Sequence, residues 1–141
     1  MYAGPSVPRA EAGVAPSAHL GALVLGSRAP RRAAAWYRSA LGLSGDGAVL
    51  TAGEAKIRFV SRADVAPAAV EAIRCIVNFH VDDVRAVEAR LVDMEAVWVR
   101  EVESTPWGMI GTVLDPDGNY VQIVEPVPDS PPCLQLKEES P

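Results

Sequence analysis

The 141-residue sequence has few of the residues and runs that mark several protein classes. It has two cysteines, Cys75 in an apolar run and Cys133 in a proline-rich stretch, which are too few and too differently placed for a disulfide framework or a zinc site. Lysine and arginine are scattered and the net charge is −5, which argues against a nucleic-acid partner. The sequence also lacks a long apolar run, and residues 1–18 do not resemble a secretory signal. We therefore expect a cytoplasmic protein with no membrane partner.

The apolar residues that are present suffice for one core. They make up 49% of the chain, as expected for a single globular domain. Residues 1–18 are rich in Ala, Gly, Pro and Ser, and residues 127–141 combine prolines with a charged end. Such composition is typical of disordered tails. We therefore predict one folded domain over residues 19–126, between an N-terminal tail (1–18) and a C-terminal tail (127–141).

Inside this domain, the order strand, helix, strands occurs twice. The apolar stretches Leu20–Gly26 and Cys75–Val81 each precede a helical pattern. Pro30 suits the start of the first helix and Gly42 its end, while Asp82 and Asp83 suit the start of the second. Strand-like segments follow each helix, so the chain has an internal repeat of about fifty residues. We place the two modules at about 19–62 and 73–126.

The modules are not equally long. Twelve residues separate Leu43 from Lys56, which leaves room for one hairpin and little for a third strand. The first module is therefore expected to have a truncated sheet edge or to lack a full strand. In the second module, Asp115-Pro116-Asp117-Gly118 suits a type I turn, so the last two strands should be antiparallel neighbours. The predicted fold class is α+β.

Three stretches together carry a resemblance to a known superfamily: AAAWYRSALGL (33–43), NFHVDDVRAVEARL (78–91) and TPWGMIGTVLDPDGNYVQIVEP (105–126). In this order and spacing they resemble the vicinal oxygen chelate superfamily, which includes glyoxalase I, extradiol dioxygenases, fosfomycin-modifying enzymes and bleomycin-resistance proteins. The resemblance implies two βαβββ modules whose curved mixed sheets enclose a cavity. It also implies a homodimer, because dimerisation commonly completes that cavity.

The resemblance further implies four positions for a divalent metal ion, usually His, Glu, His and Glu. In this sequence the positions fall on Ala22, Arg58, Ile76 and Gln122. Among these, Gln122 alone keeps a donor atom, and a neutral amide oxygen by itself does not hold an ion. We therefore predict that the protein has no metal site and no cofactor.

A shift of the register by one residue would make His19 and His80 the candidate metal ligands. His19 precedes the first strand, where a solvated side chain is the usual outcome. His80 alternates with Ile76 and Asn78, which places all three on the cavity side of their strand. A single histidine without partners is more often a hydrogen-bonded lining residue than a metal ligand.

The same alternation predicts an apolar cavity with a few polar groups. Arg58 is expected either to pair with a carboxylate or phenolate of a ligand or to reach solvent. The resemblance places Trp98, Trp107 and Met109 at the mouth of the cavity, where aromatic faces could stack on a planar ligand. Trp36 and Tyr37 are assigned to the core by their helical spacing. The predicted ligand-binding residues are Arg58, Asn78, His80, Trp98, Trp107, Met109, Tyr120 and Gln122.

Three functions are compatible with this sequence. The favoured one is a metal-free protein, like the bleomycin-resistance branch, that binds a hydrophobic or aromatic small molecule, for instance to sequester an antibiotic. The alternative is a metal-independent isomerase, cyclase or lyase that uses His80 as general base and Arg58 or Gln122 to stabilise an oxyanion. The third is a domain that mediates dimerisation alone. Fold analogy does not choose among them.

Overall fold

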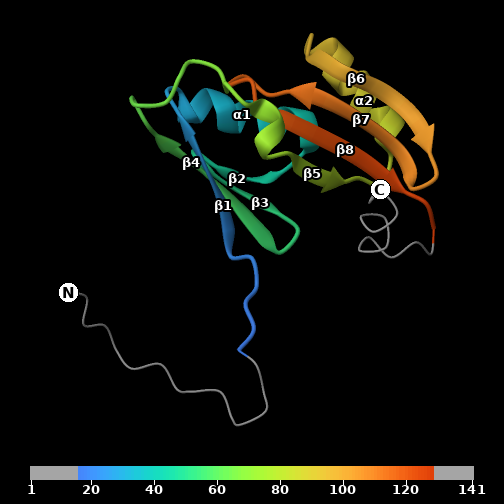
Figure 1. Ribbon diagram of the computed structural model, residues 1–141, viewed down its shortest axis with the longest axis horizontal. Coiled ribbons are helices and arrows are strands. Elements are labelled where there is room, and N and C mark those ends of the chain that lie inside the picture. Colours follow the sequence, from blue (N-terminus) through green and yellow to red (C-terminus); the bar gives the residue numbers. More distant parts are fainter. Residues whose placement is uncertain (1–15, 129–141) are drawn as a thin grey trace.

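The computed structural model describes residues 16–128 and shows two mixed β-sheets, each with its own helix (Figure 1). Each sheet has four strands, so the predicted α+β class is confirmed. The predicted tails, residues 1–18 and 127–141, lie outside the described residues except for 16–18 and 127–128.

Sheet A is built by the first module. Its strand order is β1-β4-β3-β2, with β1 parallel to β4 and the other neighbours antiparallel. Its edge strand β2 has three residues, so the expected shortening of this module trims one edge and removes no strand. The elements of the module are β1 (Ala22–Ser27), α1 (Pro30–Leu41), β2 (Ser44–Asp46), β3 (Val49–Ala52) and β4 (Ala55–Ser61).

Sheet B is built by the second module in the same way. Its order is β5-β8-β7-β6, with β5 parallel to β8 and antiparallel pairs elsewhere, so the internal βαβββ repeat is confirmed. The short 3₁₀ helix η1 (Ala72–Arg74) lies in the segment between the modules. The elements of the second module are β5 (Val77–His80), α2 (Val84–Asp93), β6 (Val97–Thr105), β7 (Gly108–Leu114) and β8 (Tyr120–Pro126).

The helix boundaries follow local chemistry. Helix α1 has Pro30 in its first turn, and it ends at Gly42, whose φ of 65° is the left-handed conformation that glycine adopts most easily. The Asp83 side chain accepts a hydrogen bond from the Ala86 backbone N–H at 3.1 Å and so caps α2. Helix α2 has no glycine at its end. Glu95 takes the left-handed position there instead, with φ 57°.

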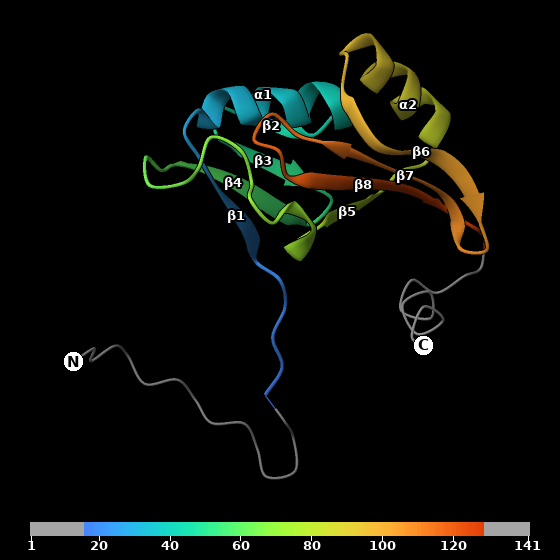
Figure 2. The same cartoon turned by 45° about the horizontal axis from the view of Figure 1, so that its top comes forward.

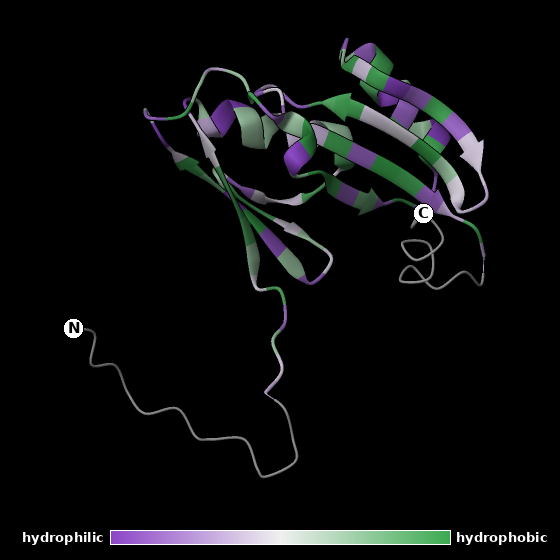
Figure 3. Cartoon of the chain, in the orientation of Figure 1, coloured by the Kyte–Doolittle hydropathy of each residue, from purple (hydrophilic) through white to green (hydrophobic). Residues whose placement is uncertain are grey.

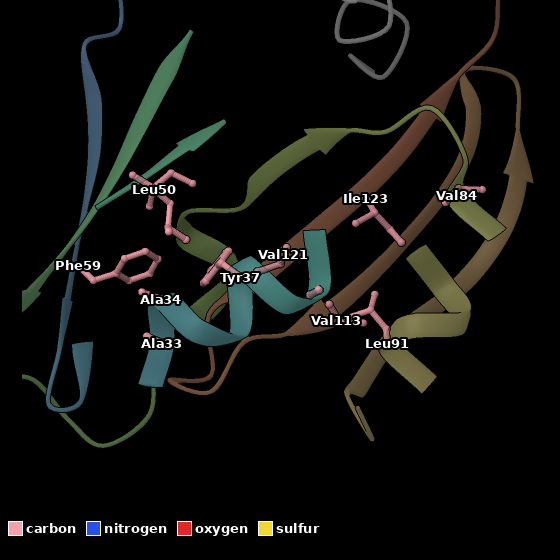
Figure 4. Packing of buried hydrophobic residues seen from close by; sticks show 12 residues of the cluster. Ala33, Ala34, Tyr37, Leu50, Phe59, Val84, Leu91, Val113, Val121 and Ile123 are labelled. Atoms are coloured by element: carbon pink, nitrogen blue, oxygen red, sulfur yellow. The ribbon is translucent and has the colours of Figure 1, made fainter. Parts of the chain in front are cut away.

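Both helices cover the same side of the two sheets (Figure 2). The core lies between this helix layer and the sheets (Figure 4). Alternate residues of the strands face the helices: Ile57 and Phe59 on β4, and Val121 and Ile123 on β8, are buried. Apolar residues alternate with charged ones over residues 55–59 of β4, as is common in a sheet with one covered face (Figure 3). Among the described residues, no helix is long and apolar enough to cross a membrane.

A buried hydrogen bond joins the two modules. The Tyr37 hydroxyl of α1 donates to Asp115 Oδ2, in the turn between β7 and β8, at 2.6 Å. Both residues are buried, and Asp115 also accepts from the backbone N–H groups of Asp117 and Asn119 and from Asn119 Nδ2. Burial, together with the charge and hydrogen bond of Asp115, raises the pKa of Tyr37 far above its ordinary value. The tyrosine that the sequence assigned to the core therefore also holds the second module in place.

We expect Tyr37→Phe to lower the free energy of unfolding by about 1.5–3 kcal/mol at pH 7, because a buried hydrogen bond to a charged group is lost. The pH dependence should change as well. In the wild type, the folded state keeps the Tyr37 proton above about pH 10, where an unfolded tyrosine ionises, so stability should fall by up to about 1.4 kcal/mol per pH unit. Tyr37→Phe should lose this contribution and show a shallower alkaline decline. Urea unfolding between pH 7 and 11 measures both effects.

Tyr120→Phe is the matched control, because Tyr120 is half-buried and lies on β8, outside this hydrogen bond. Tyr120→Phe should lower the free energy of unfolding by less than Tyr37→Phe does. It should also leave the decline of stability at alkaline pH as in the wild type. Equal stability of Tyr37→Phe and the wild type would mean that the inter-module hydrogen bond contributes nothing.

Candidate ligand-binding site

A groove of about 380 Å³ runs between the β3–β4 hairpin of sheet A and strand β5 of sheet B. This volume lies within the range of small-molecule sites in proteins. The hairpin contributes Ala52, Gly53 and Ala55 to one wall. The larger apolar residues that line the groove are Leu20, Leu23, Leu43, Ile57, Val77 and Phe79.

Three polar side chains belong to the lining: Lys56, Asn78 and His80. Asn78 and His80 were predicted ligand-binding residues, and both are exposed on β5. Lys56 was not among the predicted site residues. The sequence contains a signal for Lys56 as a site residue. Lys56 lies two residues before Arg58 on β4, so both side chains project from the same face of the strand. The groove is thus an apolar cleft with one cation, one imidazole and one amide.

Gln122 lies beside Asn78. The two residues are direct neighbours in the parallel pairing of β5 and β8, and Asn78 Nδ2 donates to Gln122 Oε1 at 2.6 Å. The oxygen at the position of the superfamily's last ligand therefore already accepts a hydrogen bond from a neutral amide. This pair joins two of the predicted site residues.

The other superfamily metal positions do not bring metal-binding atoms together. Ala22 lies opposite Lys56, Arg58 lies opposite Val24, and Ile76 comes one residue before β5. Among residues 16–128, no three His, Cys, Asp or Glu side chains are grouped so that they could hold a metal ion. The described side chains thus do not fit the divalent ion that the superfamily usually binds.

Arg58 and Tyr120 are placed apart from the groove. Arg58 is exposed on β4, on the face of sheet A that turns away from α1. Tyr120 is half-buried at the start of β8, opposite Leu114. His19 is exposed and precedes β1, outside the strand. The structure thus brings Asn78, His80 and Gln122 together but not these three residues.

The predicted aromatic mouth of the cavity has another role in the structure. Trp98 and Met109 pack against the hydrophobic core cluster on the helix-covered side of sheet B. Trp98 also lies over Gly111, where an added Cβ would come within 3.1 Å of its ring. Both side chains thus have packing contacts, and neither lines the groove between the sheets. Trp107 is half-buried between β6 and β7, and it does not line the groove.

Comparison with known proteins identifies the class. The model of the glyoxalase-like domain family matches residues 22–124, so the chain belongs to this family, and the predicted membership of the vicinal oxygen chelate superfamily is confirmed. A search among curated proteins found no match.

Solved structures share the fold. TnmS3, an antibiotic binding protein from Streptomyces sp. CB03234, is 22% identical, with a TM-score of 0.61 over 78% of this chain and 97% of its own. TioX from Micromonospora sp. ML1 is 20% identical, with a TM-score of 0.60 over 78% of this chain and 100% of its own. A glyoxalase/bleomycin resistance protein from Streptomyces sp. CB03234 is 21% identical, with a TM-score of 0.58 over 76% and 100%. At these identities the likeness concerns the fold alone.

The placement of Trp98 and Gln122 predicts that truncation of Trp98 destabilises the protein more than truncation of Gln122. Trp98→Ala should lower the free energy of unfolding by about 2–3 kcal/mol, because it opens a cavity beside Gly111 in a packed layer. Gln122→Ala should cost less than about 1 kcal/mol, because it removes one neutral hydrogen bond on an open face. Urea unfolding of the two variants makes the comparison. A larger loss for Gln122→Ala would identify the Asn78–Gln122 pair as a structural support instead of a surface pair.

Proposed function

We propose that the protein binds a hydrophobic or aromatic small molecule in the groove between its sheets and that it does so without a metal ion. The observation that carries this proposal is the groove itself, whose walls are mostly apolar and which includes the polar side chains of Asn78 and His80. Apolar walls with a few polar groups are the usual composition of a small-molecule site. The structural likeness to TnmS3, an antibiotic binding protein, supports the same class of function, for instance antibiotic sequestration.

The metal-free part of the proposal rests on the side chains at the ligand positions. Gln122 Oε1 accepts a hydrogen bond from Asn78, and Ala22, Arg58 and Ile76 offer no oxygen or imidazole ligand. A divalent ion needs several anionic or imidazole donors at once. Binding therefore has to use shape, apolar contact and hydrogen bonds.

The proposal includes a homodimer. On sheet A, the face that turns away from α1 leaves Val24 and Val49 exposed, 51% and 41% respectively. A second copy of the chain would cover these valines and close the open side of the site, which is what the resemblance to the superfamily implies. Exposed β-branched residues on a strand favour such burial.

A binding function is preferred to an isomerase or lyase for a specific reason. In the part of the chain that the structure describes, His80 makes no hydrogen bond or ion pair that would orient its imidazole. A general base is usually held in position by a second group. Arg58, the residue proposed for oxyanion stabilisation, does not line the groove with His80.

Metal analysis tests the metal-free part. After purification without added metal, we expect less than stoichiometric Zn, Ni, Mn and Fe in the protein. Saturating concentrations of each ion should leave the midpoint of thermal unfolding unchanged, since a ligand of the native state must raise it by mass action. Added EDTA should leave small-molecule binding unaltered. One tightly bound ion per chain, or a large upward shift with one ion, would contradict this part of the proposal.

Filling the groove tests the binding site. N-phenyl-1-naphthylamine is a neutral planar probe whose fluorescence rises in apolar surroundings, and we expect the wild type to bind it. Ala55→Trp places an indole at the β3–β4 hairpin wall and should weaken binding at least about tenfold, or about 1.4 kcal/mol. The control is Ala35→Trp, which adds the same side chain at an exposed position of α1. Absence of binding by the wild type, or equal loss in both variants, would contradict the groove as the site.

A further inference from the structure

Most cations in the described part of the chain have partners. Five arginines form ion pairs with a carboxylate, and three others donate to a backbone carbonyl oxygen. Among residues 16–128, Lys56, Arg58 and Arg31 do neither. Two of these three lie on one face of strand β4.

The two unpaired cations of β4 are neighbours. Lys56 and Arg58 are exposed and alternate with the buried Ile57, so both side chains project from the face of sheet A that turns away from α1. We call this surface the outer face of sheet A. Two residues along a strand are about 6.6–6.8 Å apart at the backbone, so one acidic group could contact both side chains. Two neighbouring like charges repel each other, and an anion bound between them would offset this repulsion.

The surroundings of this pair are apolar. Arg58 lies between Val24 of β1 and Val49 of β3 in the strand register, and both valines are exposed. Lys56 lies between Ala22 and Thr51 in the next row. Apolar neighbours lower the local dielectric once the second copy of the chain in the proposed homodimer covers them, and this strengthens attraction between opposite charges.

Within residues 16–128, no carboxylate forms an ion pair with Lys56 or Arg58. Glu54 is close in sequence, in the turn between β3 and β4, but it forms no ion pair with Lys56 among the described residues. The groove lining contains Lys56 and His80 and no Asp or Glu. A chain with a net charge of −5 thus has a local cationic site on an apolar surface.

From this arrangement we infer that the ligand carries an acidic group, a carboxylate, sulfonate or phenolate, on an apolar planar body. Lys56 and Arg58 hold the acidic group on the outer face of sheet A. The body extends from there into the groove, because Lys56 belongs to both surfaces. The guanidinium can contact a planar carboxylate with two parallel hydrogen bonds, and the ammonium acts as a point charge on a flexible stem. This inference deepens the proposed function and rests on it.

Two fluorescent probes that differ in one acidic group test the inference. 8-Anilinonaphthalene-1-sulfonate is the sulfonated counterpart of N-phenyl-1-naphthylamine, so the two share the same aromatic body. We expect the wild type to bind the sulfonate at least about tenfold more tightly than the neutral probe, because each charged hydrogen bond adds to affinity. Raising NaCl from 50 to 500 mM should weaken binding of the sulfonate and leave that of the neutral probe nearly unchanged.

The variants assign the effect to the two side chains. Lys56→Met and Arg58→Met should each weaken sulfonate binding about five- to tenfold. Because Arg58 lies outside the groove lining, Arg58→Met should also leave neutral-probe binding within twofold. Lys56→Arg keeps the positive charge and should therefore retain most of the wild-type affinity for the sulfonate. Arg31→Met is the matched control, since it removes an equally unpaired cation from α1, on the opposite side of sheet A. It should bind both probes like the wild type.

The outcomes separate this inference from the proposed function. If both probes bind equally, or if Arg31→Met weakens sulfonate binding as much as Lys56→Met, the charge selectivity is overturned while the proposed function stands. If neither probe binds, the proposed function fails and the inference fails with it. Urea unfolding of each variant shows whether a loss of binding reflects a loss of fold.

Discussion

The arrangement of this protein depends on a buried hydrogen bond between the Tyr37 hydroxyl and the Asp115 carboxylate. Asp115 is 5% exposed and is satisfied by four donors, three of them from its own turn, so a buried charge is tolerated there. The fourth donor comes from the helix of the other module. Because a buried charge without its partner is costly, this bond favours one placement of sheet B against sheet A. The groove lies between residues of the two modules, the β3–β4 hairpin of sheet A and β5 of sheet B.

One face of each sheet packs against a helix, and the other face carries exposed side chains. On β4, Ile57 and Phe59 pack under α1, while Lys56 and Arg58 face away from it. Strand alternation lets one segment contribute to the core and to a surface without conflict. On sheet B, the Trp98 side chain packs against the core cluster on the helix-covered side, over Gly111.

Gln122 carries an amide where the resemblance to the superfamily places a carboxylate ligand. A carboxylate beside a histidine pair attracts a cation, whereas the amide oxygen of Gln122 accepts a hydrogen bond from Asn78. On sheet A, the equivalent position holds Arg58, a cation. The side chains at these two positions are thus an amide on sheet B and a cation on sheet A, and neither is an anionic metal ligand.

The sequence by itself determined the repeat, the two helices with their caps, the α+β class and the superfamily, because periodicity, capping residues and turn chemistry act over a few residues. It also placed Asn78, His80 and Gln122 on one side of their strands. The tertiary structure decided which surfaces meet. Lys56 lines the groove, and Arg58 and Tyr120 lie outside its lining. Trp98 and Met109 pack against the core cluster. These outcomes depend on how two sheets pack across residues far apart in the chain, through contacts such as Tyr37–Asp115 that no local pattern encodes.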